Sequence, residues 1–263
     1  MLVIAQFMMD GGVSAKESVM QNSKKILIRK LLLAAFLLPN FIFAAATDPT
    51  ASPFPNAKPG INIMPLSATN LPSVMQQPIL RGMQAFVREG YEETTDTDQS
   101  VHSLMLLQKT ALAEINQFDN SRDPYDTHLK SSITKLKLSF KFSGIPDVEK
   151  KDIIGFAAAG GYTKPAGWDG VVEFISLPDI GICSFTTYAI EKVILDTETL
   201  EYLVDQKPSN KHVGGNWNTG FLYTLNWYDP NRLMSLECAS SLLKSDALSK
   251  MIGMAKRIDK SIS

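Results

Sequence analysis

Two cysteines, Cys183 and Cys238, are the most reactive side chains that the sequence offers. A cysteine can act as a nucleophile, or two cysteines can pair in a disulfide. The N-terminal leader described below predicts export to an oxidising compartment, where thiols pair rather than stay free. We therefore expect a Cys183–Cys238 disulfide, and loop-closure entropy alone makes such a bridge worth about 4 kcal/mol.

Carboxylates and one histidine provide the only outline of a hydrolytic site. The residues least unsuited to this chemistry are Glu173, His212 and Asp229. Asp169 and Asp229 closely follow tryptophans, and an aromatic ring beside a carboxylate can form a sugar site with a general acid or base. The same residues have a simpler explanation, in which the tryptophans pack in the core or at its rim and the aspartates occur because turns favour them. A cell-envelope hydrolase acting on glycan or peptide is therefore the alternative interpretation.

Other catalytic and metal-binding motifs are missing from the sequence. The three histidines, His102, His128 and His212, have no metal-ligand spacing. Ser132 and Lys135 form a literal Ser-x-x-Lys, but the partner motifs of that enzyme class do not occur. The glycine spacing of phosphate-binding loops is also missing. We expect no metal and no cofactor.

The glycine-rich, polar composition of residues Asn210 to Gly220 predicts a loop that displays Trp217. The residues expected to bind a ligand there are Trp217, His212, Asn216 and Asn218. An exposed tryptophan on a glycine-rich loop is typical of a contact residue. The alternative is a wide hairpin connection whose tryptophan packs back onto a sheet.

Residues 1–46 have the pattern of an export leader. Basic residues at positions 24–30 precede an apolar run of 13 residues, Leu31–Phe43, and then three alanines. This order is typical of a cleaved signal peptide, and the run is shorter than the roughly 20 residues of a membrane-spanning helix. We expect cleavage after Ala46, no membrane span afterwards and a periplasmic or secreted protein. Translation from Met20 would give a leader of normal length, and the alternative to a leader is a short buried helix or an anchor.

The charge balance excludes one class of partner. The chain carries 26 Lys and Arg against 27 Asp and Glu, and removal of the leader, with its five basic and two acidic residues, leaves a net charge of −4. A mildly acidic protein offers no electrostatic footprint for nucleic acid or for an anionic membrane. We therefore expect an exported, non-enzymatic binding or interaction module whose partner is a protein or a cell-envelope ligand.

The elements that would position these residues follow a simple order. A proline-rich linker or strap is expected over 47–77. Apolar residues at helical period predict helices over 78–90, 98–118, 232–243 and from Ser245 to the end. Alternating or fully apolar runs predict strands over 134–142, 153–159, 168–177, 181–195 and 220–228.

This order of elements predicts one α+β domain over residues 78–263. Helices come first, strands follow, and helices end the chain, without the regular βα alternation of a parallel fold. We expect an antiparallel sheet of about five or six strands, two N-terminal and two C-terminal helices packed on it, and one disulfide.

Overall fold

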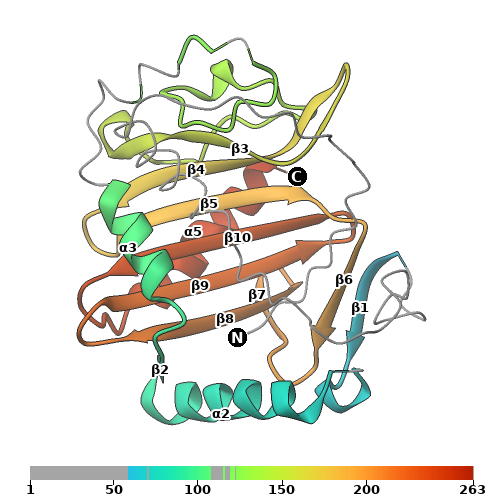
Figure 1. Ribbon diagram of the computed structural model, residues 1–263, viewed down its shortest axis with the longest axis vertical. Coiled ribbons are helices and arrows are strands. Elements are labelled where there is room, and N and C mark those ends of the chain that lie inside the picture. Colours follow the sequence, from blue (N-terminus) through green and yellow to red (C-terminus); the bar gives the residue numbers. More distant parts are fainter. Residues whose placement is uncertain (1–58, 70, 108–114, 116–118, 122, 263) are drawn as a thin grey trace, which may run out of the picture.

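A mixed sheet dominates the computed structural model, which describes residues 59–69, 71–107, 115, 119–121 and 123–262 (Figure 1). Its strands are β2 (Glu92–Glu93), β3 (Ile153–Thr163), β4 (Gly167–Leu177), β5 (Gly181–Ala189), β7 (Glu201–Val204), β8 (Lys207–Asn216), β9 (Gly220–Asp229) and β10 (Arg232–Ser240). They lie in the order β2-β8-β9-β10-β5-β4-β3, with β7 paired to β8. The short β2 runs parallel to β8, and the long strands are antiparallel to their neighbours.

The remaining elements lie around this sheet. A second, two-stranded sheet pairs β1 (Gly60–Met64) with β6 (Lys192–Asp196) in parallel. The longer helices among the described residues are α2 (Ser73–Glu89), α3 (Asp98–Leu107) and α5 (Ala247–Ile262). Short 3-10 turns span Leu66–Ala68, Ile133–Lys135 and Lys150–Asp152. Within the described part of the chain, no helix has the length and apolar character needed to span a membrane.

The predicted fold class is wrong in its sheet and in its helices. The main sheet has eight strands and is mixed, a two-stranded sheet accompanies it, and the described residues form three longer helices rather than four. The largest single error is the helix predicted over 232–243, because that segment forms β10. Apolar residues lie on both faces of β10, with Leu236 on one side and Leu233 and Ala239 at the two ends of the other. Such a doubly covered strand also contains a stripe at helical spacing, so periodicity alone misassigns it.

The strand predicted over 134–142 is also wrong. The segment begins with the turn Ile133–Lys135 and makes one isolated bridge, between Leu138 and Trp168. The last β5 residue paired with β4 is Tyr188, opposite Gly170, so the bridge to Trp168 lies beyond the end of the β4–β5 ladder. Only a short length of strand edge is therefore available to this segment.

Other predicted elements are confirmed with changed boundaries. Strands occupy 153–163, 167–177 and 220–229, and the last helix is α5. The predicted strand over 181–195 divides into β5 and β6. The first helix ends before Gly90, as expected, but begins at Ser73 and contains Pro78. The second begins at Asp98, as predicted, and its continuation beyond Leu107 falls largely outside the described residues.

Both faces of the sheet are covered, and each carries a hydrophobic cluster. On one face α5 packs Met251, Ala255 and Ile258 against aromatic and aliphatic residues that include Phe221 and Trp227. On the other face α3 packs Val101 and Leu104 near one end of the strands. The other end of that second face is covered by β1 and β6. In Figure 1, α3 lies in front of the sheet and α5 behind it.

The predicted disulfide is confirmed. Cys183 and Cys238 are bonded, and they are direct cross-strand partners on β5 and β10, with Cα atoms 4.0 Å apart. Both residues are buried on the face that α5 covers. The bridge therefore ties two neighbouring strands, whereas the predicted helix at Cys238 would have made it a link between sheet and helix.

Replacing both cysteines by alanine should lower the free energy of unfolding by about 2–4 kcal/mol, because the unfolded chain regains the freedom of a long loop. Chemical denaturation of the variant against the oxidised wild type measures this difference. Wild type kept reduced during the same experiment is the matched control and should lose a similar amount. Equal stability of oxidised and reduced wild type would contradict the prediction.

Candidate functional site

The predicted loop over 210–220 is mostly strand. Residues up to Asn216 belong to β8, and a turn of three residues joins it to β9. Gly215, with φ of +151°, lies so close to the neighbouring strand that a Cβ there would be 2.2 Å from the carbonyl oxygen of Gly220. This glycine permits close approach of two strands, so the glycine-rich composition indicates a tight hairpin.

Asn216 holds the turn in place. Its Oδ1 accepts hydrogen bonds from the backbone N–H groups of Asn218 (3.0 Å) and Thr219 (3.1 Å). Its Nδ2 donates to the carbonyl oxygen of Thr94 (3.2 Å) and to Oδ1 of Asp98 (2.9 Å), the first residue of α3. The Asn216 amide is therefore a structural connection between hairpin and helix. It borders a hollow of about 650 Å³ lined by Glu93, Thr94, Thr95, Asp98, Asn216, Asn218 and Thr219.

Trp217 lies away from that hollow. Its side chain is exposed (62%), and its ring makes an edge-to-face contact with Phe221, at 4.9 Å between centroids. Tyr91 contacts both rings edge-on, at 6.4 Å from Trp217 and 5.4 Å from Phe221. Phe221 belongs to the cluster that α5 covers, whereas Asp98 lies on α3 at the opposite face. The structure thus separates Trp217 from the polar hollow beside Asn216 and Asn218.

His212 is buried and already engaged. Its Nε2 lies 3.1 Å from Oε2 of Glu92, and its ring contacts that of Phe86 at 5.7 Å. Burial lowers the pKa of His212 although Glu92 opposes the shift, and the hydrogen bond from His212 lowers the pKa of Glu92. The imidazole is therefore neutral at pH 7 and donates Nε2–H to the carboxylate. This pair fastens β8 to the segment that follows α2.

The three residues of the hydrolase hypothesis are remote from one another. Glu173 lies on β4 and His212 on β8, which are four strand positions apart, or roughly 19 Å at the usual strand spacing. Asp229 ends β9 and pairs with Lys207 at 2.7 Å. The same Lys207 contacts Asp259 of α5 at 2.7 Å. The arrangement therefore provides no common pocket for the three groups.

Glu173 is fully buried (0% exposed) on the face that includes Ile145 and Ile175. Its Oε2 accepts a hydrogen bond from the backbone N–H of Ile145 (2.7 Å), whereas Oε1 has no partner. Burial raises the pKa of this carboxyl to about 7, and the bond from Ile145 only partly opposes the shift. Glu173 is thus a buried acid that anchors the turn at Gly144 and Ile145.

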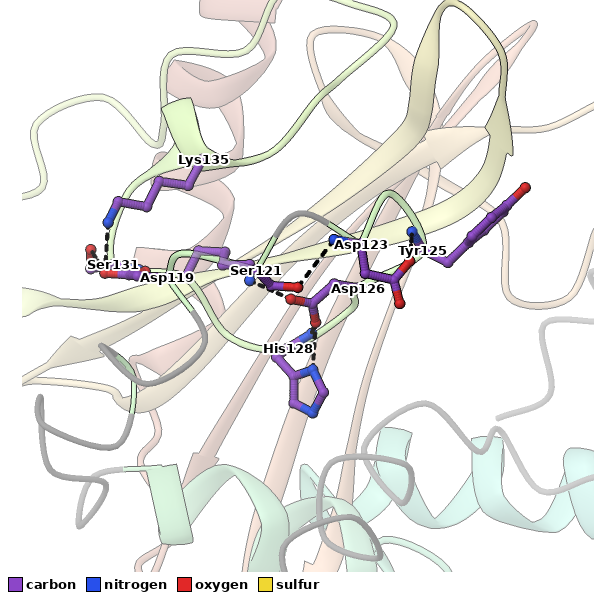
Figure 2. A network of polar contacts seen from close by, with 9 residues as sticks. Asp119, Ser121, Asp123, Tyr125, Asp126, His128, Ser131 and Lys135 are labelled. Atoms are coloured by element: carbon purple, nitrogen blue, oxygen red, sulfur yellow. Dashed lines mark hydrogen bonds and ion pairs between the residues drawn. The ribbon is translucent and has the colours of Figure 1, made fainter. Parts of the chain in front are cut away.

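A group of ion pairs lies in the irregular segment before β3 (Figure 2). Asp119 accepts hydrogen bonds from Ser131 N (2.8 Å) and Oγ (2.6 Å) and pairs with Lys135 (2.9 Å). Asp126 accepts from Lys130 Nζ (2.5 Å) and from the backbone N–H of His128 (2.8 Å), and it also contacts the His128 ring.

These ion pairs are local supports. Although burial opposes the shift, the hydrogen bond from Lys130 and those from other neighbours lower the pKa of Asp126 to about 2. The backbone of Lys130 exchanges two hydrogen bonds with Phe156 of β3 (2.7 and 2.8 Å). The network therefore attaches a segment without regular secondary structure to the edge of the sheet.

A polar surface that the sequence analysis missed lies on the face beneath α3. It is formed by alternate residues of four neighbouring strands: Ser184 and Thr186 on β5, Ser235 and Glu237 on β10, Thr224 and Asn226 on β9, and Asn210 and His212 on β8. We call this set the polar face. Alternation within 182–188 and 221–227 was the available signal, but the helix assigned over 232–243 concealed the central strand.

The buried acid Glu173 makes stability depend on pH in a defined direction. Its pKa is about 7 in the folded chain and about 4.5 when exposed, so the folded state binds the extra proton between these values. Stability from this group is present below pH 4.5 and is lost as pH rises through 7, a loss of about 3 kcal/mol.

Glu173→Gln should therefore remove this decline, because the amide keeps an acceptor for Ile145 and carries no charge. Thermal unfolding from pH 5 to 8 tests this, with the exposed Glu191→Gln as the control that retains the wild-type slope. The same slope in Glu173→Gln and wild type would contradict the assignment.

No protein-family model, no curated protein and no solved structure matches this chain. The functional conclusion therefore depends on the geometry of its own side chains.

Proposed function

We propose that this protein is an exported, non-enzymatic binding module that contacts a protein or cell-envelope partner through Trp217. The observation that carries this proposal is the 62% exposure of Trp217 on a hairpin turn whose conformation is fixed by Asn216. A tryptophan is a large apolar group, and exposed tryptophans supply much of the binding energy at protein interfaces.

The contacts that the Trp217 ring makes with its neighbours favour a role in binding. Its ring rests edge-on against Phe221 and Tyr91, which restricts its orientation before any partner arrives. Ordering a side chain on association costs free energy, so a ring that is already oriented binds more tightly. The Trp217 ring is therefore preorganised for binding a partner.

Further exposed apolar side chains lie at the same end of the sheet. Val87 (84% exposed) is in the last turn of α2, shortly before β2. Leu242 (62% exposed) follows β10, whose last residue Ser240 pairs with Phe221. Exposed apolar side chains at the same end of the sheet as Trp217 favour a contact with a partner there.

The leader and the disulfide support the exported location in this proposal. A signal-like segment precedes the domain, and a buried disulfide is compatible with an oxidising compartment. A partner in the cell envelope or outside the cell follows from that location.

Capture of partners from the native envelope fraction tests the proposed contact. Trp217→Ala should lose the captured component, because the exposed ring supplies the interaction, while its melting temperature should change by no more than about 2 °C. Tyr202→Ala removes another exposed aromatic ring (52%) on β7 and is the matched control, which should retain capture. Retention of the partner by Trp217→Ala, or its loss in both variants, would refute Trp217 as the contact.

A further inference from the structure

Residues 139–149, which we call the cover segment, lie on the face of the sheet that also holds α5. They form neither helix nor strand. Ile145 is buried in the cluster shared with α5, and Phe142 and Val148 pack against that cluster. The Phe142 ring lies 5.8 Å from the ring of Phe185 on β5. The segment is therefore attached chiefly by its side chains, and a segment of this kind opens at a lower cost than a strand within a ladder.

Glu173 lies beneath the cover segment and is held by the sheet itself. Its strand pairs with β3 and β5, where Phe156 and Phe185 are its direct partners. The side chain is 0% exposed. Its Oε2 accepts the N–H of Ile145 at 2.7 Å, and Oε1 has no hydrogen-bond partner among the described residues. Because β4 cannot shift without breaking two ladders, water reaches this carboxyl most readily when the cover segment moves.

A tight turn directs the Ile145 N–H at Glu173. Gly144 and Asp147, on either side of it, have φ angles of +96° and +64°. Glycine and aspartate both adopt this left-handed region more readily than most residues. A Cβ on Gly144 would lie 3.5 Å from Oε2 of Glu173, so the backbone of the turn rests directly on the carboxyl group.

No cation of the described residues compensates the Glu173 carboxyl. Charged side chains on the surrounding elements include Asp147 and Glu149 on the cover segment, Lys151 before β3, Asp169 on β4, Arg232 on β10 and Arg257 on α5. Arg257 pairs with Asp147 (3.4 Å), and Lys151 pairs with Glu149 (2.8 Å). Arg232 lies over the Phe140 ring and 3.5 Å from the carbonyl oxygen of Asp169. Burial therefore raises the pKa of Glu173, and the Ile145 bond alone opposes it.

We propose that the cover segment opens when Glu173 ionises, so that the protein covers part of its hydrophobic cluster in acid and exposes it near neutral pH. A buried carboxylate with a single hydrogen bond and no cation is strongly destabilised, and hydration removes that cost. Local opening of the segment provides the hydration while the sheet stays intact. The Phe185 ring, which packs against Phe142 in the closed state, is among the apolar groups uncovered.

Opening is coupled to the release of a proton, which fixes the direction and range of the response. The pKa of Glu173 is about 7 when covered and returns toward 4.5 when hydrated. The closed state is therefore fully favoured below pH 4.5, and the open fraction rises as the pH increases to 7 and levels off above it. From pH 5 to 7.5 the opening equilibrium should increase roughly 50-fold.

Hydrogen exchange measured by nuclear magnetic resonance on the full chain tests this opening, with each rate corrected for the pH dependence of an unprotected amide. The Ile145 amide should lose protection roughly 50-fold from pH 5 to 7.5, and it should exchange faster than the Leu225 amide, which lies between β8 and β10. Urea below the unfolding transition should accelerate exchange at Leu225 and leave Ile145 unchanged, because local opening exposes little surface. Equal rates and equal urea dependence at the two amides would mean that the chain opens only globally, and would overturn the proposal.

Glu173→Gln is the decisive variant, because the amide keeps an acceptor for Ile145 and cannot ionise. Protection of the Ile145 amide should then be independent of pH between 5 and 7.5. Asp147→Asn is the matched control, since it removes a charge from the same turn and asparagine also tolerates the left-handed backbone there. This control should keep the wild-type response to pH. A response that persists in Glu173→Gln, or one that vanishes in Asp147→Asn, would also overturn the proposal.

Discussion

The pairing register of β5, β10 and β9 is the constraint on which the rest of the structure depends. Side chains alternate between the faces of a strand, so a slip of one residue would exchange every inward and outward position. In the observed register Phe185, Leu236 and Leu225 face α5, whereas Ser184, Glu237 and Thr224 face the side of α3. The disulfide between directly opposed residues is compatible with this register alone. Core, cross-link and polar face therefore have one geometric origin.

How far sequence could predict this fold depends on whether one or both faces of an element are covered. The last helix, α5, has one apolar stripe, and helical periodicity located it. The strand β10 carries apolar residues on both sides, with Leu233 and Ala239 at the ends of one face, so a strand and a helix fitted its pattern equally well. For residues 134–142 the alternation was genuine, but a strand also needs a free edge, and the available edge accepts a single bridge at Trp168. Edge availability is a property of the whole sheet and cannot be seen in a local window.

In the candidate site, too, the sequence predicted some features and missed others. The sequence singled out Trp217, which the structure places on the surface, and it identified the disulfide from compartment and count. It also grouped Glu173 and His212, which lie four strands apart, because residue type carries no information on distance. The polar face was missed because its members are neighbours only across strands, and those neighbours are known only when the register is known.

The Asn216 amide has a mechanical consequence for the hairpin that displays Trp217 and for helix α3. It joins the hairpin that carries Trp217 to Asp98 at the start of α3, and Thr219 strengthens the joint by donating to the same carboxylate at 2.5 Å. The helix fastened in this way is the one that borders the polar face. A displacement of the hairpin must either break these bonds or move the helix with it, so Asn216 and Thr219 together connect opposite sides of the sheet.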